Sequence, residues 1–542
     1  MSNRKKEVLI FLLLLVALFA AHVAVYRASE PFYYNDETRH VMTGVYFRDL
    51  LADMPFGNLR EYTVSYYLQY PALGLLVWPP LFYILEGLLM SVFGTSLVVP
   101  QALVGLFAAM GCAYLYLLVR RTSDAATATL ATLIFGFSPL VFEYSQYVML
   151  EVPTLALGLA ATYHFVRYLD AQHRRDIMLA AVFSALAALT RFDAVYLLPL
   201  FLLALAVRGR WGLLRRGEVW MAAALALALV LPFYALTARE IGWFHLKQAS
   251  ETLSPDFPPY LSLKRYFFYP SHLPSQLGWF ALVPALVGLV AGISPARRGA
   301  AWVFYTLIGA TYATFTLMGE VDSRHTIYWL PAFSYFAAIG LALVARRLRV
   351  PGTYVPLSAL VVVAMALTAL ARPKAYVRGY EEAARYVLSS GDSSPFCLFV
   401  GRLNGDFIYQ LRRHDPSRRL WTLRADKIIF SVLVNPQVGY AQAAQSDEDI
   451  LATIFRYDPQ FIVVEEAQTP ETQPVENQLR AIINNRPDRF QLDKAVTIES
   501  NDLALNGKQI RVFRNLLRNS NPERRLDVNL LILRRSVQTD VP

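Results

Sequence analysis

The sequence predicts a polytopic α-helical membrane protein that carries an α/β domain at its C-terminal end. The first observation is composition, because 55% of the 542 residues are hydrophobic and only 17% are charged, whereas a soluble chain carries about 25% charged residues. The second is that apolar residues gather in continuous blocks of about 17–22 residues, the length of membrane-spanning helices and not the alternating pattern of a β-barrel. The third is that apolar runs shorten and charge rises after residue 372.

About eleven apolar runs are predicted to cross the membrane as helices. Additional short helices would raise this count to about thirteen and would keep both chain ends on the same sides. The predicted spans cover residues 8–25, 98–119, 125–142, 152–169, 177–190, 194–207, 218–237, 276–294, 300–318, 326–345 and 353–371.

Residues 78–94 form a further apolar run that is ambiguous, because it is short, begins Trp78-Pro79-Pro80 and contains Glu86. If this run lies on the membrane surface, nearly every basic doublet falls on the side of the N-terminus, as the positive-inside rule requires. We therefore predict a juxtamembrane or re-entrant helix here, a cytoplasmic N-terminus and an extracytoplasmic C-terminal domain. The basic clusters are Arg4-Lys5-Lys6, Arg120-Arg121, Arg174-Arg175, Arg208 to Arg216, Arg297-Arg298 and Arg346-Arg347.

The net charge of +10 belongs to these loops in this interpretation, so no nucleic-acid partner is expected. The expected location is the cytoplasmic (inner) membrane, where membrane lipids surround the chain. We interpret the first run as an uncleaved anchor, although Ala21-His22-Val23-Ala24 faintly resembles a signal-peptide cleavage site. Either interpretation places Asp36 outside. Cys112 and Cys397 are predicted to be unpaired, and neither has metal-ligand spacing.

We divide the chain into a transmembrane domain, residues 1–372, and an extracytoplasmic α/β domain, residues 373–542. Two long outer loops, 28–97 and 239–275, interrupt the first domain. Within the first loop, residues 37–52 are predicted to form an amphipathic helix. In the C-terminal domain we predict strands at 396–400 and 461–465 and helices at 380–389, 447–457 and 475–485, with Ser446 as an N-cap.

Unusual polar residues gather at the predicted outer ends of the spans, whereas the middles of the spans are nearly free of charge. Charged groups in a bilayer are costly and mark function, and transporters tend to carry theirs at mid-span. The pattern therefore favours an active site at the outer membrane surface. Carboxylates there can act as a base or hold a divalent cation, and arginines can bind phosphate. The candidates are Asp36, Glu37, Arg39, His40, Glu151, Arg191, Asp193, Arg324 and His325.

Each candidate also has a structural explanation. Asp36 could simply be solvated, and Glu151 could be a helix-start carboxylate favoured by the helix dipole. Arg191 and Asp193 could form a local ion pair, and Arg324 could anchor the chain at the interface. The convergence of polar residues at nearly every outer turn favours function. The sequence has no phosphate-binding loop, nucleophile elbow or zinc-protease motif, so no nucleotide cofactor is expected.

In their order along the chain these motifs resemble those of GT-C fold glycosyltransferases, in particular lipid A aminoarabinose transferases and protein O-mannosyltransferases. Asp36-Glu37 resembles the Asp-Glu motif in the first outer loop of that family, and Pro79 to Tyr83 resembles its juxtamembrane segment. Residues 138–153 resemble the segment with the second acidic residue, Thr190 to Ala194 the basic turn, and Arg324 to Pro331 the Arg-Tyr stretch. The likeness covers most of the chain before residue 372, and the C-terminal domain shows no motif of the family.

The resemblance implies transfer, with inversion, of a monosaccharide from a polyprenyl-phosphate donor to an extracytoplasmic acceptor. Asp36 matches the acidic residue that acts as base toward hydroxyl acceptors, and Glu151 stands at the second acidic position as a catalytic candidate. Both could also hold one divalent cation, Mg²⁺ or Mn²⁺, or none. Arg191 and Arg324 are candidate ligands of the donor phosphate. We also assign the following residues to substrate binding: His325, Arg39, His40, Glu37, Tyr33, Tyr34, Tyr147 and Lys264.

Our hypothesis from the sequence is a membrane glycosyltransferase whose acceptor is a lipid, a glycan or a protein. We expect Asp36, Glu151, Arg191 and Arg324 to share a pocket. The alternative is a transporter or flippase of a lipid-linked intermediate, which would place polar residues at mid-membrane and show repeat symmetry. A receptor or assembly scaffold would not need arginines and carboxylates at so many outer span ends.

Overall fold

The computed structural model describes residues 3–23, 32–242, 244, 246–247, 258–348, 352–390, 394–432, 439–468 and 472–541. The chain forms two compact units. The first unit comprises Met1–Tyr26, Leu76–Phe82 and Pro100–Lys374, and the second comprises Arg27–Leu75, Tyr83–Val99 and Ala375–Pro542. Most of the segment that we predicted as the first outer loop therefore groups with the C-terminal domain.

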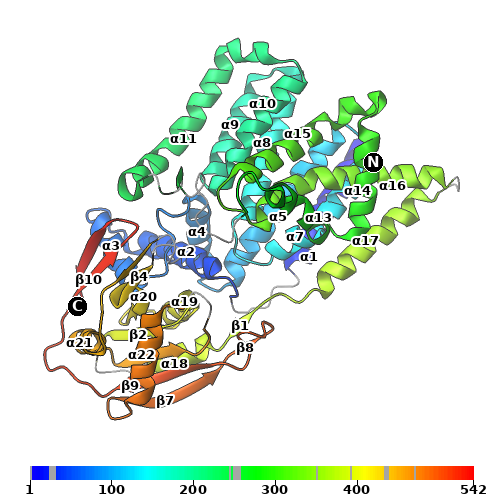
Figure 1. The fold of residues 1–542 in the computed structure, drawn as a ribbon. Coiled ribbons are helices and arrows are strands. Elements are labelled where there is room, and N and C mark those ends of the chain that lie inside the picture. Colours follow the sequence, from blue (N-terminus) through cyan, green and yellow to red (C-terminus); the bar gives the residue numbers. More distant parts are fainter. Residues whose placement is uncertain are drawn as a thin grey trace. The chain divides into compact units, whose positions relative to one another are not determined.

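The first unit is helical (Figure 1). Each predicted apolar run is mostly helical where it is described, as expected of apolar segments whose backbone hydrogen bonds must be made internally. The helices are α1 (Asn3–Val23), α5 (Val98–Arg120), α6 (Ala125–Gly136), α7 (Pro139–Tyr144), α8 (Glu151–Ala171), α9 (Arg174–Ala188), η1 (Phe192–Tyr196), α10 (Leu197–Val207), η2 (Trp211–Arg215), α11 (Gly217–Ile241), α13 (Leu263–Leu277), α14 (Trp279–Gly292), α15 (Pro295–Leu317), η3 (Ser323–Trp329), α16 (Leu330–Arg347) and α17 (Tyr354–Ala371).

Five helices in the described part of the chain are long and apolar enough to cross a membrane. They are Val98–Arg120, Gly217–Ile241, Pro295–Leu317, Ser323–Arg347 and Tyr354–Ala371. Shorter apolar helices of 10–17 residues occur at Phe11–Val23, Leu81–Phe93, Ala125–Gly136, Phe192–Val207 and Trp279–Gly292. The chain is a multi-pass membrane protein, and its number of spans remains a prediction.

Two segments of the first unit differ from the sequence-based expectation. The run at 125–142 is divided into α6 and α7, because Pro139 starts a new helix, a position that proline favours. The predicted loop 239–275 contains helix α13, which begins after Ser262, whose side chain accepts the N–H of Arg265. Residues 248–257 of that loop lie outside the described residues.

The second unit contains a five-stranded sheet in the order β3-β2-β6-β9-β7. Strand β2 (Phe396–Val400) pairs in parallel with β3 (Trp421–Arg424) and β6 (Phe461–Glu465), whereas β9 (Gln509–Asn515) is antiparallel to β6 and to β7 (Phe490–Thr497). The predicted bounds of β2 and β6 are confirmed, because strands that are buried throughout have mostly continuous apolar sequences, with the buried Glu465 as the last residue of β6. The two-stranded pairs are β1 (Val377–Arg378) with β8 (Glu499–Ser500), β4 (Phe430–Val432) with β5 (Tyr440–Gln442) and β10 (Arg525–Leu530) with β11 (Arg535–Asp540).

Two hydrophobic cores lie in the second unit, and successive residues of β2 face different cores. Leu398 packs with residues of α21 and α22, and Phe399 packs with residues of α18 and α19. The predicted cap of α21 is confirmed, since the Ser446 side chain accepts the N–H of Asp449. The helices of the C-terminal stretch are α18 (Tyr380–Ser390), α19 (Asn404–His414), α20 (Ala425–Ile428), α21 (Asp447–Tyr457) and α22 (Pro474–Asn485).

The first-loop segment adds three helices: α2 (Asn35–Asp53), α3 (Leu59–Gln69) and α4 (Leu81–Phe93), the last of which starts in the first unit. Helix α2 covers the helix predicted at residues 37–52, but His40 to Tyr46 are all buried, so this part of the helix has no exposed polar face. Leu68 of α3 is buried in one core with strand residues of the C-terminal stretch, and Tyr33 packs against the other core. The second unit is therefore assembled from separate stretches of chain that share their cores. Cys112 and Cys397 are both buried and unpaired, as predicted.

Candidate active site

Glu151 of the first unit forms ion pairs with two arginines that are distant in the sequence. Arg191 Nη1 lies 3.1 Å and Arg324 Nη1 lies 3.5 Å from Glu151 Oε1. Glu151 is the first residue of α8, Arg191 immediately precedes η1, and Arg324 lies in the first turn of η3. The structure thus brings together three of the four residues expected to share a pocket, whereas Asp36 belongs to the second unit.

Each of these arginines also pairs with a carboxylate close to it in sequence. Arg191 Nε is 2.6 Å from Asp193 Oδ2, and Arg324 Nε is 2.9 Å from Asp322 Oδ2. The ion pair that we considered for Arg191 and Asp193 is therefore present. We call Glu151, Arg191, Asp193, Asp322 and Arg324 the Glu151 group.

The Glu151 group is a buried network of opposite charges. The Glu151 side chain has no exposed surface, and that of Arg191 is 10% exposed. Burial alone would raise the pKa of Asp322, but the positive charges of Arg324 and His325 outweigh it and hold that pKa below its ordinary value. Asp322 is therefore an anion, and Glu151 in the first turn of α8 lies where the helix dipole favours an anion.

The arrangement suits the binding of a phosphate group. A guanidinium carries N–H donors on all three nitrogens, and Arg191 uses only Nε and Nη1 in the two ion pairs that the structure describes for it. Its Nη2 can donate to a further anion, and arginine forks match phosphate oxygens. A divalent cation at Glu151 is disfavoured, because two guanidinium groups already lie against the carboxylate. Within the described ranges, no group of three His, Cys, Asp or Glu side chains could hold a metal ion.

The first unit also contains an apolar cavity of about 750 Å³, lined by residues that include Phe142, Tyr147 and Trp279. Arg372 and Lys374, which follow α17, line it as well. Lys374 Nζ lies 5.1 Å from the centre of the Tyr147 ring. A mostly apolar wall with a few cationic groups fits an amphiphile that has an anionic head.

Other predicted residues of the first unit have different surroundings. His325 is buried and stacks on Phe315, with 5.4 Å between the ring centres. Lys264 is exposed on α13, whereas its neighbour Arg265 is buried and donates to the Thr316 carbonyl at 2.8 Å. Sequence reasoning therefore selected the exposed cation of this pair and missed the buried one, which ties α13 to the end of α15.

In the second unit, Asp36 and Glu37 both lie in the first turn of α2, but their environments differ. Glu37 is buried, and its Oε2 accepts the N–H groups of Tyr33 at 3.2 Å and Tyr34 at 3.3 Å. This geometry is that of a carboxylate that caps the start of a helix. Asp36 is partly exposed. The Tyr33 hydroxyl donates to Asp502 Oδ2 at 3.1 Å.

Arg39 lies one turn further along α2, in a charged environment. Its Nη1 donates to the Asn35 carbonyl at 3.1 Å. Burial lowers the pKa of Arg39 and the charge of Arg424 lowers it further, whereas Asp36 and Asp426 act in the opposite direction. The pKa of Arg39 therefore depends both on the charge of Asp36 in the same helix and on the charge of Arg424 in the C-terminal stretch.

Several charged or polar residues of these sites were missed by sequence reasoning. In the second unit Arg424 is the last residue of β3, Asp426 and Lys427 follow it, and burial lowers the pKa of Lys427 to about 8. Their place at the carboxyl end of a parallel strand, where α/β domains bind ligands, was the available signal. The predicted residue His40 has its Nδ1 atom 2.7 Å from the hydroxyl of Tyr83, which was not among the predicted site residues. In the first unit the Tyr328 hydroxyl donates to Asp193 Oδ2 at 3.2 Å.

Comparison with known protein families identifies the class of fold. Residues 77–235 match a family described as dolichyl-phosphate-mannose-protein mannosyltransferase. No curated protein matches the sequence. Together with the solved structures described next, this match shows that the chain has a GT-C fold of the kind found in such mannosyltransferases.

Several solved structures resemble this chain. The crystal structure of ArnT from Cupriavidus metallidurans bound to undecaprenyl phosphate is 13% identical, with a TM-score of 0.65 over 95% of this chain and 99% of that chain. The apo state of the same protein gives 13% identity and a TM-score of 0.64 over 96% and 100% of the two chains. The apo oligosaccharyltransferase of Archaeoglobus fulgidus gives 11% identity and a TM-score of 0.51 over 84% and 69%. At these identities the likeness shows the fold.

Proposed function

We propose that the protein is a membrane glycosyltransferase that moves a monosaccharide from a polyprenyl-phosphate donor to an acceptor outside the cytoplasm. The observation that carries the proposal is the meeting of Arg191 and Arg324 at the buried Glu151 carboxylate, in a chain with a GT-C fold. Two guanidinium groups in fixed orientation can bind the donor phosphate and stabilise the charge that it gains as it leaves. The fold is shared with ArnT, a protein crystallised with undecaprenyl phosphate, which supports a lipid-phosphate donor.

In the proposed reaction Asp36 is the general base. Its carboxylate takes the proton of the acceptor hydroxyl while the hydroxyl oxygen forms a bond to the anomeric carbon of the sugar. The bond from that carbon to the phosphate oxygen breaks, and its electron pair leaves with the polyprenyl phosphate. Attack from the face opposite the phosphate inverts the anomeric configuration. No nucleotide is needed, because the lipid phosphate is already a good leaving group.

The proposed role of Glu151 differs from that of Asp36. Its carboxylate holds Arg191 and Arg324 at fixed positions from which they bind the phosphate. The apolar cavity lined by Phe142 and Trp279 is the proposed place for part of the isoprenoid chain. Tyr147 and Lys374 line the same cavity. A divalent cation, Mg²⁺ or Mn²⁺, would bind through Asp36, since the surroundings of Glu151 favour an arginine partner.

The proposed location is the cytoplasmic (inner) membrane, with the N-terminus inside and the C-terminal domain outside. The support is the distribution of basic clusters among the predicted loops. A tag after Pro542 should be accessible from the outside of intact cells. Protection of this tag would reverse the orientation and, with it, the side on which transfer occurs.

The proposed function can be tested by mass spectrometry of membrane lipids and envelope glycans from cells with and without the protein. In cells without the protein, one polyprenyl-phosphate sugar should accumulate and one glycosylated product should be missing. The purified full chain in detergent should then transfer that sugar to an extract that contains the acceptor. Accumulation of the same lipid without any transfer in detergent would favour the transporter, because detergent removes the two compartments that a flippase connects.

A further inference from the structure

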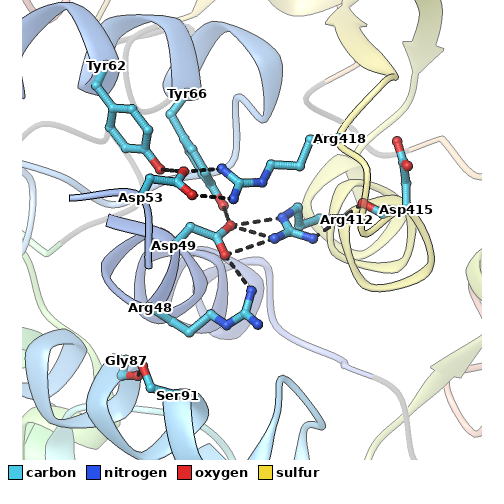
Figure 2. Close-up of polar contacts among 10 residues, drawn as sticks. All are labelled: Arg48, Asp49, Asp53, Tyr62, Tyr66, Gly87, Ser91, Arg412, Asp415 and Arg418. Carbon is cyan, nitrogen blue, oxygen red and sulfur yellow. Dashed lines mark hydrogen bonds and ion pairs between the residues drawn. The ribbon is translucent and has the colours of Figure 1, made fainter. Parts of the chain in front are cut away.

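Helix α2, which carries Asp36 at its start, is attached near its other end to helix α19 of the C-terminal stretch. Figure 2 shows the Asp49 carboxylate of α2 facing the Arg412 guanidinium of α19. Arg412 Nη2 donates to Asp49 Oδ1 at 2.8 Å and to Oδ2 at 2.7 Å, and Arg412 Nε donates to Oδ2 at 3.0 Å. Both residues belong to the second unit and both are buried.

Further contacts surround this ion pair. Tyr66 of α3 donates its hydroxyl to Asp49 Oδ2 at 2.6 Å, and Arg48 Nη1 donates to Oδ1 at 2.7 Å (Figure 2). One turn further on, Arg418 Nη2 donates to Asp53 Oδ1 at 2.8 Å. The C-terminal end of α2 is therefore held by charged hydrogen bonds with fixed geometry, of the kind that specifies orientation.

The first turn of α2 also touches the start of α19. Asn35 Nδ2 donates to the Arg402 carbonyl at 2.9 Å. A Cβ atom on Gly405 would lie 1.9 Å from Thr38 Oγ1, so the two helix starts approach at a distance that only glycine allows. Asp36 lies between Asn35 and Thr38 in the sequence. Helix α19 and the residue Arg402 just before it thus contact both sides of the Asp36 position, and α19 also contacts the far end of α2.

Helix α4 packs closely on α2 as well, where both belong to the second unit. A Cβ atom on Gly44 would lie 2.3 Å from Glu86 Cδ, and one on Gly87 would lie 2.8 Å from Phe47 Cβ. Contacts this close leave α2 little freedom to shift sideways. The remaining freedom of the helix is to tilt or slide along α19, and the Asp49–Arg412 pair opposes both movements.

We infer that the Asp49–Arg412 ion pair is a positioning contact for Asp36, acting through α2. Thr38 and Asp49 are eleven positions apart, so the two attachments of α2 to α19 are separated by about 16 Å. Two attachments at that spacing fix the direction of the helix axis. If the attachment at Asp49 is lost, the helix can tilt, and its first turn, which carries Asp36, can move. The inference rests on the proposed function, because it gives the C-terminal stretch the role of placing the proposed base.

The alternative explanation is that the pair only stabilises the second unit. The test therefore needs a readout that a purely stabilising contact would not change. Arg412→Lys keeps the charge but loses the bidentate geometry. Arg480→Lys is the matched control, because Arg480 is also a buried arginine of the second unit, and its described partners Glu476 and the Glu465 carbonyl are not in α2.

The first measurement is hydrogen–deuterium exchange of the purified full chain. In Arg412→Lys, exchange should rise at the amides of Asn35 to Arg39 as well as near Asp49, whereas Arg480→Lys should leave the first turn of α2 unchanged. Faster exchange confined to the Asp49 end would overturn the inference, because the contact would then be local. This arm does not depend on any catalytic activity, so it stands if the proposed function fails.

The second measurement separates turnover from donor binding. The donor in this assay is the polyprenyl-phosphate sugar that accumulates in cells that lack the protein. With this donor, Arg412→Lys should lower kcat about tenfold or more. Its affinity for undecaprenyl phosphate should stay within twofold of the unsubstituted protein, since the Glu151 group is untouched. An unchanged kcat with a lowered unfolding temperature would reduce the pair to a stabilising contact. Absence of transfer by the unsubstituted protein would instead refute the proposed function.

Discussion

The Arg191 guanidinium lies 3.1 Å from the Glu151 carboxylate, which has no exposed surface and is also 3.5 Å from Arg324. Glu151→Gln removes a negative charge that competes with phosphate for both arginines. We expect the affinity for undecaprenyl phosphate to rise by about 1 kcal/mol, roughly fivefold, while the unfolding temperature falls because two buried cations lose a counter-charge. Asp176→Asn is the control, since Asp176 is a buried carboxylate of the same unit that pairs with Arg167. An unchanged affinity in Glu151→Gln would mean that the phosphate binds elsewhere. A weaker affinity would contradict this prediction and would mean that the positioning of the two arginines by Glu151 outweighs its competition with phosphate.

Arg324→Ala should weaken donor binding without preventing folding. The loss of a charge-assisted hydrogen bond to phosphate costs about 1.5–3 kcal/mol, which is roughly a 10- to 100-fold increase in Kd. Binding of undecaprenyl phosphate to the purified protein measures this directly. Arg167→Ala, which removes the arginine paired with Asp176, should bind the lipid normally. Equal affinities of Arg324→Ala and the unsubstituted protein would remove Arg324 from the phosphate site.

The adjacent carboxylates Asp36 and Glu37 should respond in opposite ways to amide substitution. Asp36→Asn should reduce transfer by about 100- to 10,000-fold, the usual contribution of a general base, and leave the yield of folded protein unchanged. Glu37→Gln should keep most of the activity and lose about 1 kcal/mol of stability, because Glu37 caps α2. Transfer rates and unfolding temperatures of both variants check this. Full activity of Asp36→Asn would remove the base assignment.

Asp406 predicts a pH dependence of stability. Burial raises the pKa of this carboxyl from its ordinary value to about 8, and the charges of Glu37 and Glu465 add to the effect. The native protein therefore binds a proton between pH of about 4 and about 8 that the unfolded chain releases, so the free energy of unfolding falls as the pH rises through this window. Asp406→Asn should remove up to about 1.4 kcal/mol per pH unit of this slope. Unfolding temperatures measured from pH 5 to 8 should be flatter in the variant, and parallel curves would refute the assignment.

Gly405→Ala should disturb the contact between α19 and the first turn of α2. The added Cβ would lie 1.9 Å from Thr38 Oγ1 and 2.7 Å from Thr38 Cβ, so one helix must move. We expect a loss of about 1–3 kcal/mol, the usual cost of overpacking, together with reduced transfer. Gly57→Ala is the control, because nothing lies within 4 Å of a Cβ at that position. Normal stability of Gly405→Ala would show that the two helix starts separate without cost.

The local parts of the fold could be predicted from the sequence, because each has a local signal. Apolar runs marked the helices of the first unit, and short apolar runs of five and four residues marked β2 and β6, the latter ending in Glu465. Helix α3 had no such signal, because its apolar and aromatic residues alternate with polar ones and form no long continuous apolar run. Its burial depends on strands that come more than three hundred residues later, and no window of sequence contains both partners.

The candidate site was predictable only where chain order gave a clue. Glu151, Arg191 and Arg324 each stand at or next to the start of an element, and the family resemblance selected all three, which the structure places close together. Asp49 and Arg412 carry no sign of their pairing, because an aspartate in a helix is usually exposed and its partner lies in another segment. Buried ion pairs between distant residues need the tertiary structure that they help to specify.

The shared cores of the second unit have a consequence for engineering. A chimera that exchanges only the residues after Lys374 would pair a foreign sheet with the native α3 and would leave Asp49 facing a side chain of unknown charge. A working exchange has to carry Arg27–Leu75, Tyr83–Val99 and Ala375–Pro542 together. For the same reason, homologous chains should vary these three stretches in concert, since a change in one is tolerated only when the other two accommodate it.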